Sequence, residues 1–162
     1  MPHPVFIICC DSMVEDKTTN RASLLNVIEK VITRKHRMEM TPDGGLVMPT
    51  APPQGFALHF ECSVLAVWMA DPGDVGLEFR HQFITTAPNG AIDPITEPIP
   101  FRFVEKRAWR RFRLNMIGTL PVDTSGIFQF ESRVITHDNR TLSQFYPLQI
   151  EVESAEAVSP SG

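Results

Sequence analysis

Apolar and polar residues alternate most regularly between Ile127 and Val152, in two runs that flank Asp138-Asn139. Side chains point to opposite faces at successive positions of a strand, so each run predicts a strand with one apolar face. Asp and Asn tolerate the left-handed backbone of a hairpin turn. A hairpin with one apolar face is barely stable alone, so the earlier chain is expected to supply the sheet that covers it.

A second hairpin is predicted over residues 56–84. Its two alternating runs are separated by Asp71-Pro72-Gly73-Asp74, in which proline presets the first corner of a turn and glycine accepts the second. Near Val67 and Trp68 both faces of the first run become apolar. We therefore expect this strand to lie beneath a second layer.

The first part of the chain is less regular. Val5 to Cys10 is a continuous apolar run, as expected of a strand buried on both faces, and residues 15–21 are polar and predict a loop. The spacing in Ser23 to Thr33 fits either a helix or a strand. Its four β-branched aliphatic residues favour a strand, but for residues 23–35 the choice stays open.

Two proline-rich connections, residues 36–55 and 88–100, predict irregular chain, and Trp109 to Gly118 alternates again as a strand. About seven or eight strands with turn signals between them, and at most one short helix, predict an all-β antiparallel sandwich, immunoglobulin-like or jelly-roll-like. We expect one domain over residues 1–153 and a flexible tail over residues 154–162.

Composition agrees with an ordinary globular domain. The chain has 162 residues, 43% of them hydrophobic and 21% charged, which is too apolar for a disordered chain. The formal net charge of −4 argues against a protein whose whole surface targets nucleic acid. Three cysteines, two of them adjacent, do not make a disulfide framework. With no run of membrane length and no signal peptide pattern, a soluble cytoplasmic protein is expected.

Several short motifs are similar to a family of uncharacterised bacterial β-sandwich proteins. Members of this family open with an apolar strand ending near C-D-S, continue with an S-L-x-N-V strand, and close on a G-x-F-x-F hairpin followed by L-x-I. The resemblance implies the sandwich fold and brings no activity with it. The matching residues here are Cys10-Asp11-Ser12, Ser23 to Val27, Gly126 to Phe130, and Leu148 to Ile150.

Five basic residues and two aromatic ones lie between positions 106 and 113. Guanidinium groups bind phosphate, and an exposed tryptophan can stack on a base, so this strip is a candidate anion or nucleic-acid site. The plainer interpretation is a solvated strand face whose arginines pair with carboxylates such as Glu131 or Glu151, and a third is contact with the acidic tail (Glu151, Glu153, Glu156) of a neighbouring subunit. The candidate residues are Lys106, Arg107, Trp109, Arg110, Arg111 and Arg113.

Other polar residues give weaker signals. His81 lies on an apolar strand face, where a hydrogen-bonded, semi-buried histidine is the favoured interpretation. His3, Cys9 and Cys10 lack the paired spacing of a zinc site. Aspartates at turns can bind calcium, although Asp in a turn is already explained by the backbone it caps. The turn aspartates are Asp71, Asp74, Asp123 and Asp138.

No nucleophile elbow, phosphate-binding glycine loop or zinc-protease helix is present in the sequence. We therefore expect a non-enzymatic binding or assembly module, a homo-oligomer or a partner of another protein, with no cofactor, no metal and no membrane. Nucleic acid is the alternative partner. Apolar residues at outer strand positions often mark interfaces, and the interface candidates are Leu65, Val67, Ile117 and Phe145.

Overall fold

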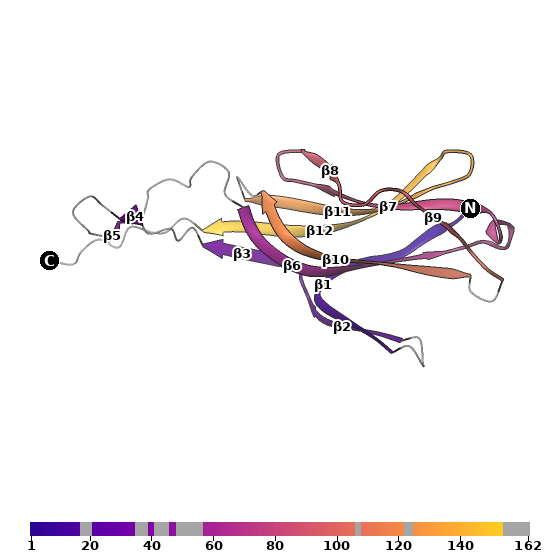
Figure 1. Ribbon diagram of the computed structural model, residues 1–162, viewed down its shortest axis with the longest axis horizontal. Coiled ribbons are helices and arrows are strands. Elements are labelled where there is room, and N and C mark those ends of the chain that lie inside the picture. The colour runs from indigo at the N-terminus through magenta and orange to yellow at the C-terminus, as the bar shows by residue number, and fades with distance from the viewer. Residues whose placement is uncertain are drawn as a thin grey trace.

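The computed structural model describes residues 1–16, 21–34, 39–40, 46–47, 57–105, 108–121 and 125–153. Its elements are strands and a single 3₁₀ turn, which confirms the predicted all-β class (Figure 1). The elements are β1 (His3–Asp16), β2 (Arg21–Val27), β3 (Lys30–Arg34), β4 (Glu39–Met40), β5 (Leu46–Val47), β6 (Ala57–Met69), η1 (Pro72–Asp74), β7 (Glu78–Thr86), β8 (Ile92–Pro94), β9 (Ile99–Arg102), β10 (Trp109–Pro121), β11 (Gly126–Ile135) and β12 (Thr141–Glu153).

Two unclosed sheets form the sandwich. Sheet A has the order β10-β6-β1-β2, and sheet B has the order β3-β12-β11-β7-β8, with β9 also paired to β7 (Figure 1). Every strand pair is antiparallel except β3 with β12, which is parallel. The two sheets hold ten described strands, more than the seven or eight expected, because β8 forms within a proline-rich connection and the stretch from Ser23 to Thr33 divides into β2 and β3. The short edge strand expected near Phe101 and Phe103 corresponds to β9.

The main core lies between the inner faces of the two sheets. Phe128, Phe130 and Leu148 from the β11–β12 hairpin pack with Cys62 and Val64 of β6. The predicted alternation along β11 and β12 is confirmed, since these side chains are buried and their neighbours in sequence face outward. Asn139 adopts a φ of 61° in the tight turn of this hairpin, as expected at Asp138-Asn139.

The ambiguous stretch from Ser23 to Thr33 forms strands and no helix. Asn26 takes a left-handed backbone, with a φ of 52°, and the chain then leaves sheet A and enters sheet B. At this crossing the Ile28 amide donates to the Cys9 carbonyl at 2.9 Å, and the Gln149 amide donates to the Glu29 carbonyl at 3.0 Å. Residues 28 and 29 therefore bond to both layers.

The hairpin predicted over residues 56–84 was wrong. β6 pairs with β1 and β10 in sheet A, whereas β7 pairs with β11, β8 and β9 in sheet B, so the predicted turn between them carries the chain from one sheet to the other.

The prediction that β6 runs beneath a second layer is confirmed. Residues 64 to 68 of β6 are buried on both faces. On the outer face Leu65 and Val67 pack with Met13 and Leu24, which belong to the β1–β2 hairpin. Figure 1 shows this hairpin leaving the sandwich on the side of sheet A. The hairpin thus covers part of the outer face of its own sheet.

Three predictions for the first part of the chain were wrong in part. The strand expected over Val5 to Cys10 runs from His3 to Asp16, and the side chains of Val5 and Phe6 are exposed. The β1–β2 pairing continues to Asp16 and Arg21, so Glu15, Asp16 and Arg21 of the predicted loop belong to strands, and residues 17–20 lie outside the described residues. Residues 36–55, expected to be irregular, include the short pair β4 and β5. The predicted tail, residues 154–162, lies outside the described residues.

Candidate binding surfaces

β10 carries the basic strip and forms the edge of sheet A. Arg111 lies opposite Val67 of β6, and Arg113 lies opposite Leu65, so the strip borders the outer face of the sheet. Arg110 is exposed at the alternate position. Lys106 and Arg107, the other two basic candidates, lie outside the described residues.

The two carboxylates named as possible partners of these arginines lie in the other sheet. The Arg111 guanidinium carbon lies 4.6 Å from the centre of the Trp109 ring, and Arg113 Nε donates to Asn115 Oδ1 at 2.8 Å. Glu131 and Glu151 both belong to sheet B, where they pair with Arg133 and Lys30. The sequence suggested these two carboxylates because alternation assigns a face to each residue and leaves its sheet undetermined.

A groove of about 270 Å³ opens between the β1–β2 hairpin and the outer face of sheet A. Leu65 and Val67, only 2% and 8% exposed, contribute to its walls together with Trp109 and Arg111. The structure therefore brings together residues from two separate sequence hypotheses, the basic strip and the interface candidates. The remaining lining residues are apolar: Phe6, Ala22 and Leu24. Such a groove can take an apolar group with a negative charge beside it.

The four interface candidates do not form one patch. Ile117 is 73% exposed on the outer face of sheet A, and Phe145 is 51% exposed on sheet B. Leu65 and Val67 point outward as predicted, but the β1–β2 hairpin covers them. Only Ile117 and Phe145 are thus exposed apolar side chains of the kind that the sequence suggested.

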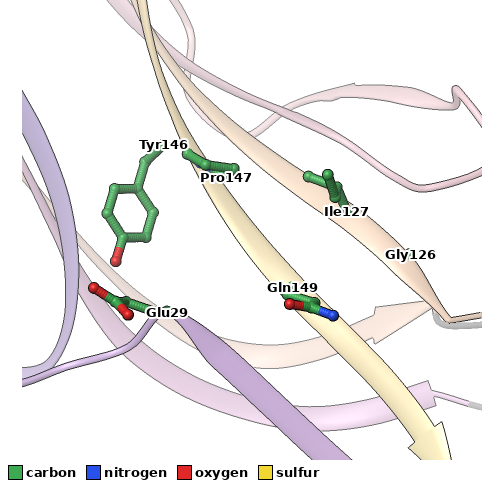
Figure 2. Close-up of a pocket in the computed structure, with 6 residues that line it drawn as sticks. All are labelled: Glu29, Gly126, Ile127, Tyr146, Pro147 and Gln149. Atoms are coloured by element: carbon green, nitrogen blue, oxygen red, sulfur yellow. The ribbon is translucent and has the colours of Figure 1, made fainter.

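A second pocket, of about 560 Å³, lies where β3 begins beside β12 (Figure 2). Tyr146 Oη donates to the Ile28 carbonyl at 2.7 Å, and its ring points toward Glu29 in Figure 2. Burial raises the pKa of the Tyr146 hydroxyl, so this group is neutral at physiological pH. Sequence reasoning missed this pocket, because the switch of sheets before β3 brings its segments together. The lining residues are Glu29, Gly126, Ile127, Tyr146, Pro147 and Gln149.

His81 is fully enclosed in the core, with 1% of its surface exposed. Its Nε2 lies 2.8 Å from Ser132 Oγ, and its ring stacks on Phe112 at 3.7 Å between ring centres. Burial lowers the pKa of His81 to about 3, which keeps the imidazole neutral. The predicted hydrogen bond is confirmed, and the histidine is more deeply buried than expected. Neither of the two pockets described above is lined by His81 or Ser132.

The three cysteines are buried free thiols. A hydrogen bond to Cys62 and burial raise the pKa of the Cys9 thiol, so it stays protonated. His3 is exposed and lies 3.7 Å from Asp71, on a different part of β1 from Cys9 and Cys10. Across the described ranges no three His, Cys, Asp or Glu side chains are grouped to hold a metal ion.

The turn aspartates bond to their local surroundings. Asp74 Oδ2 accepts from the Asp71 amide at 2.9 Å, and the Met1 amino group lies 3.0 Å from Asp71 and 3.2 Å from Asp74. Asp138 bonds to Thr136 and Arg140, and these bonds lower the pKa of its carboxyl. Asp123 lies outside the described residues. Asp74 and Asp138 thus bond within their own turns, whereas the side chain of Asp71 contacts the Met1 amino group and His3.

Within the part of the chain that the structure describes, no helix is long and apolar enough to cross a membrane. The resemblance to the uncharacterised bacterial sandwich family stays a prediction that rests on the motifs quoted above. No protein-family model matches the sequence, and no curated protein matches it.

Proposed function

We propose that this chain is a non-enzymatic binding or assembly module that associates with a second copy of itself. The supporting observation is the exposure of Ile117, which is 73% accessible in the middle of the outer face of β10. Ile117 is the most exposed of the large apolar side chains among the described residues, and exposed apolar surface is one mark of an interface. Burying one fully contributes about 1.5–3 kcal/mol.

Sedimentation equilibrium over a concentration series tests this proposal. We expect reversible self-association that weakens in Ile117→Ser. Phe145→Ser is the matched variant on the other sheet, and comparing the two variants identifies the face that associates. A strict monomer at the highest concentration contradicts the proposal.

A second candidate function is polyanion or nucleic-acid binding by the basic strip. The exposed Arg110 beside the Trp109–Arg111 stack supports it, since a guanidinium binds phosphate through several N–H donors and an indole ring can stack on a base. We expect salt-dependent binding of single-stranded nucleic acid that falls in Arg110→Ala/Arg111→Ala. Each lost phosphate contact reduces the salt slope by roughly one.

Arg102→Ala/Arg140→Ala is the control for that measurement. Both arginines are exposed and neither belongs to the basic strip, so this variant removes the same charge elsewhere. Equal losses in the two variants would show that net charge alone governs the binding. No binding by the unmodified protein at low salt would end this candidate.

A further inference from the structure

β10 presents a long strand edge. Its thirteen residues pair with β6 in one unbroken register from Trp109 to Pro121. Because β10 is the terminal strand of sheet A, no described strand pairs with its other edge (Figure 1). Such an edge offers unpaired N–H and C=O groups to another strand, and proteins usually guard it with charges, bulges or proline.

The charged residues that could discourage edge pairing lie in only one half of β10. Arg110, Arg111 and Arg113 lie before the midpoint, Asn115, and the exposed Ile117 lies after it. Pro121 is the last residue, and the pairing with β6 shows no bulge. The second half of the edge therefore has no charged residue and no proline before its end.

We propose that β10 of a second copy pairs antiparallel with this edge, with the two-fold axis at Asn115. This inference rests on the proposed self-association and specifies where it occurs. Pairing the two strands over their full length places Arg113 opposite Ile117 of the other copy and Arg111 opposite Thr119. Sheet A of one copy then continues into sheet A of the other.

Charge favours this arrangement over the parallel one. In the antiparallel register the two Arg113 residues are offset by four positions, about 14 Å along the strands, which exceeds the screening length of about 8 Å at physiological salt. Parallel pairing in register would set every arginine beside its own copy at about 5 Å, where like charges repel.

Apolar contact favours the same register. Ile117 would pack against the aliphatic stem of Arg113 from the other copy, while the guanidinium stays in water. Symmetry makes this contact twice, as expected of an isologous interface. An acidic strand from a different protein could meet the arginines of β10, and the experiments below separate that case.

Crosslinking through Asn115→Cys locates the interface. The side chain of Asn115 is exposed, and the two copies of position 115 face each other across the axis, with Cβ atoms about 5 Å apart. The native thiols are buried, so the new thiol is the reactive one, and the unmodified protein is the blank. Ile127→Cys, on exposed sheet B surface, is the control.

We expect a disulfide-linked dimer from Asn115→Cys and none from Ile127→Cys. If sedimentation shows a dimer but position 115 links no better than position 127, this inference is overturned and the proposed self-association stands. A monomer in sedimentation overturns both. Thermal melting of Asn115→Cys checks its fold, since Asn115 accepts a hydrogen bond from Ser63 at 2.9 Å.

A charge comparison at position 117 tests the register without a thiol. Across the proposed interface Ile117→Glu faces Arg113 and Ile117→Lys faces it with like charge, while both lose the same apolar contact. The dissociation constant should be roughly two- to thirty-fold lower for the glutamate variant, from two symmetric cross-strand pairs.

Within the monomer, β6 reverses the effect of charge at position 117 on stability. Ile117 lies opposite Glu61 of β6, so lysine gains an attractive pair within the chain and glutamate a repulsive one. We expect the lysine variant to melt higher as a monomer and to dimerise more weakly. Equal dissociation constants, or tighter association of the lysine variant, would overturn the register, and an acidic partner protein would then be the occupant to seek.

Discussion

Ser132 organises the polar centre of the sandwich. Its Oγ lies 2.8 Å from His81 Nε2 and 2.9 Å from Trp68 Nε1. An indole nitrogen can only donate, so in this arrangement Ser132 accepts from Trp68. This arrangement resembles a nucleophile beside a base, but all three side chains are buried and serve the packing of the core.

The buried histidine predicts how stability depends on pH. His81 has a pKa of about 3 in the folded chain and about 6.5 when unfolded. As pH falls from 6.5 toward 3, the unfolded chain gains a proton that the folded chain does not, so the free energy of unfolding decreases. The slope approaches about 1.4 kcal/mol per pH unit. Urea unfolding across this range measures it.

His81→Phe keeps a ring against Phe112 and removes the titration. Its free energy of unfolding should be lower at neutral pH, since Ser132 loses a partner, but should fall less steeply on acidification. Parallel curves for the variant and the unmodified protein would show that His81 is protonated within the fold.

The sequence predicted that His81 is hydrogen-bonded on an apolar face, but it did not identify Ser132 as the partner. The alternation places His81 on an apolar face because it lies two positions from both Phe79 and Phe83, so the three side chains share one face of the strand. Ser132 lies on β11, 51 positions away, and its proximity depends on β7 and β11 being neighbours in sheet B. Periodicity within one strand carries no information about which strand lies next to it.

Two apolar side chains on the outer face of sheet A, one on β6 and one on β10, differ in how far they are covered. Leu65 is covered by the β1–β2 hairpin, and Ile117 of β10 is exposed. Leu65→Ala should destabilise the fold by about 2–5 kcal/mol, because truncation leaves a cavity beneath the hairpin. Ile117→Ala should change stability by less than about 0.5 kcal/mol. Urea unfolding at concentrations where the chain is monomeric measures both, and similar losses would contradict the covered position of Leu65.

The start of β11 packs closely against the connection after β7. A Cβ added at Gly126 would lie 2.7 Å from Pro88 Cβ, closer than two carbon atoms approach without displacement. Gly126→Ala should therefore cost about 1–3 kcal/mol of stability. Gly73→Ala is the control, since nothing lies within 4 Å of its added Cβ. Equal melting temperatures of the two variants would show that Pro88 can shift to accommodate the added Cβ at little cost in stability.

Strands were largely predictable and their partners were not. Alternation located β6, β7, β10, β11 and β12, because each has one face toward the core. It could not show that β2 and β3 belong to different sheets, because the break between them is only two residues long. The groove that joins the basic strip to Leu65 depends on the hairpin folding over its own sheet, which no local pattern records.

For the whole molecule, the proposed dimer would place the arginines of β10 near the centre of the assembly. The two grooves beside Trp109 would then open toward the same outer surface of the joined sheet. An anionic partner could contact both copies at once, and the second contact would form at a high effective concentration. Self-association and polyanion binding are therefore compatible on this edge.

Residues 28 and 29 connect the two sheets, because their backbone bonds to Cys9 of sheet A and to Gln149 of sheet B. We therefore expect the two sheets to unfold together. Amide hydrogen exchange should find Ile28 and Gln149 as slow as the centre of β6, with all three released in one cooperative step. If the amides of one sheet exchange before those of the other, the hydrogen bonds of residues 28 and 29 break before either sheet unfolds.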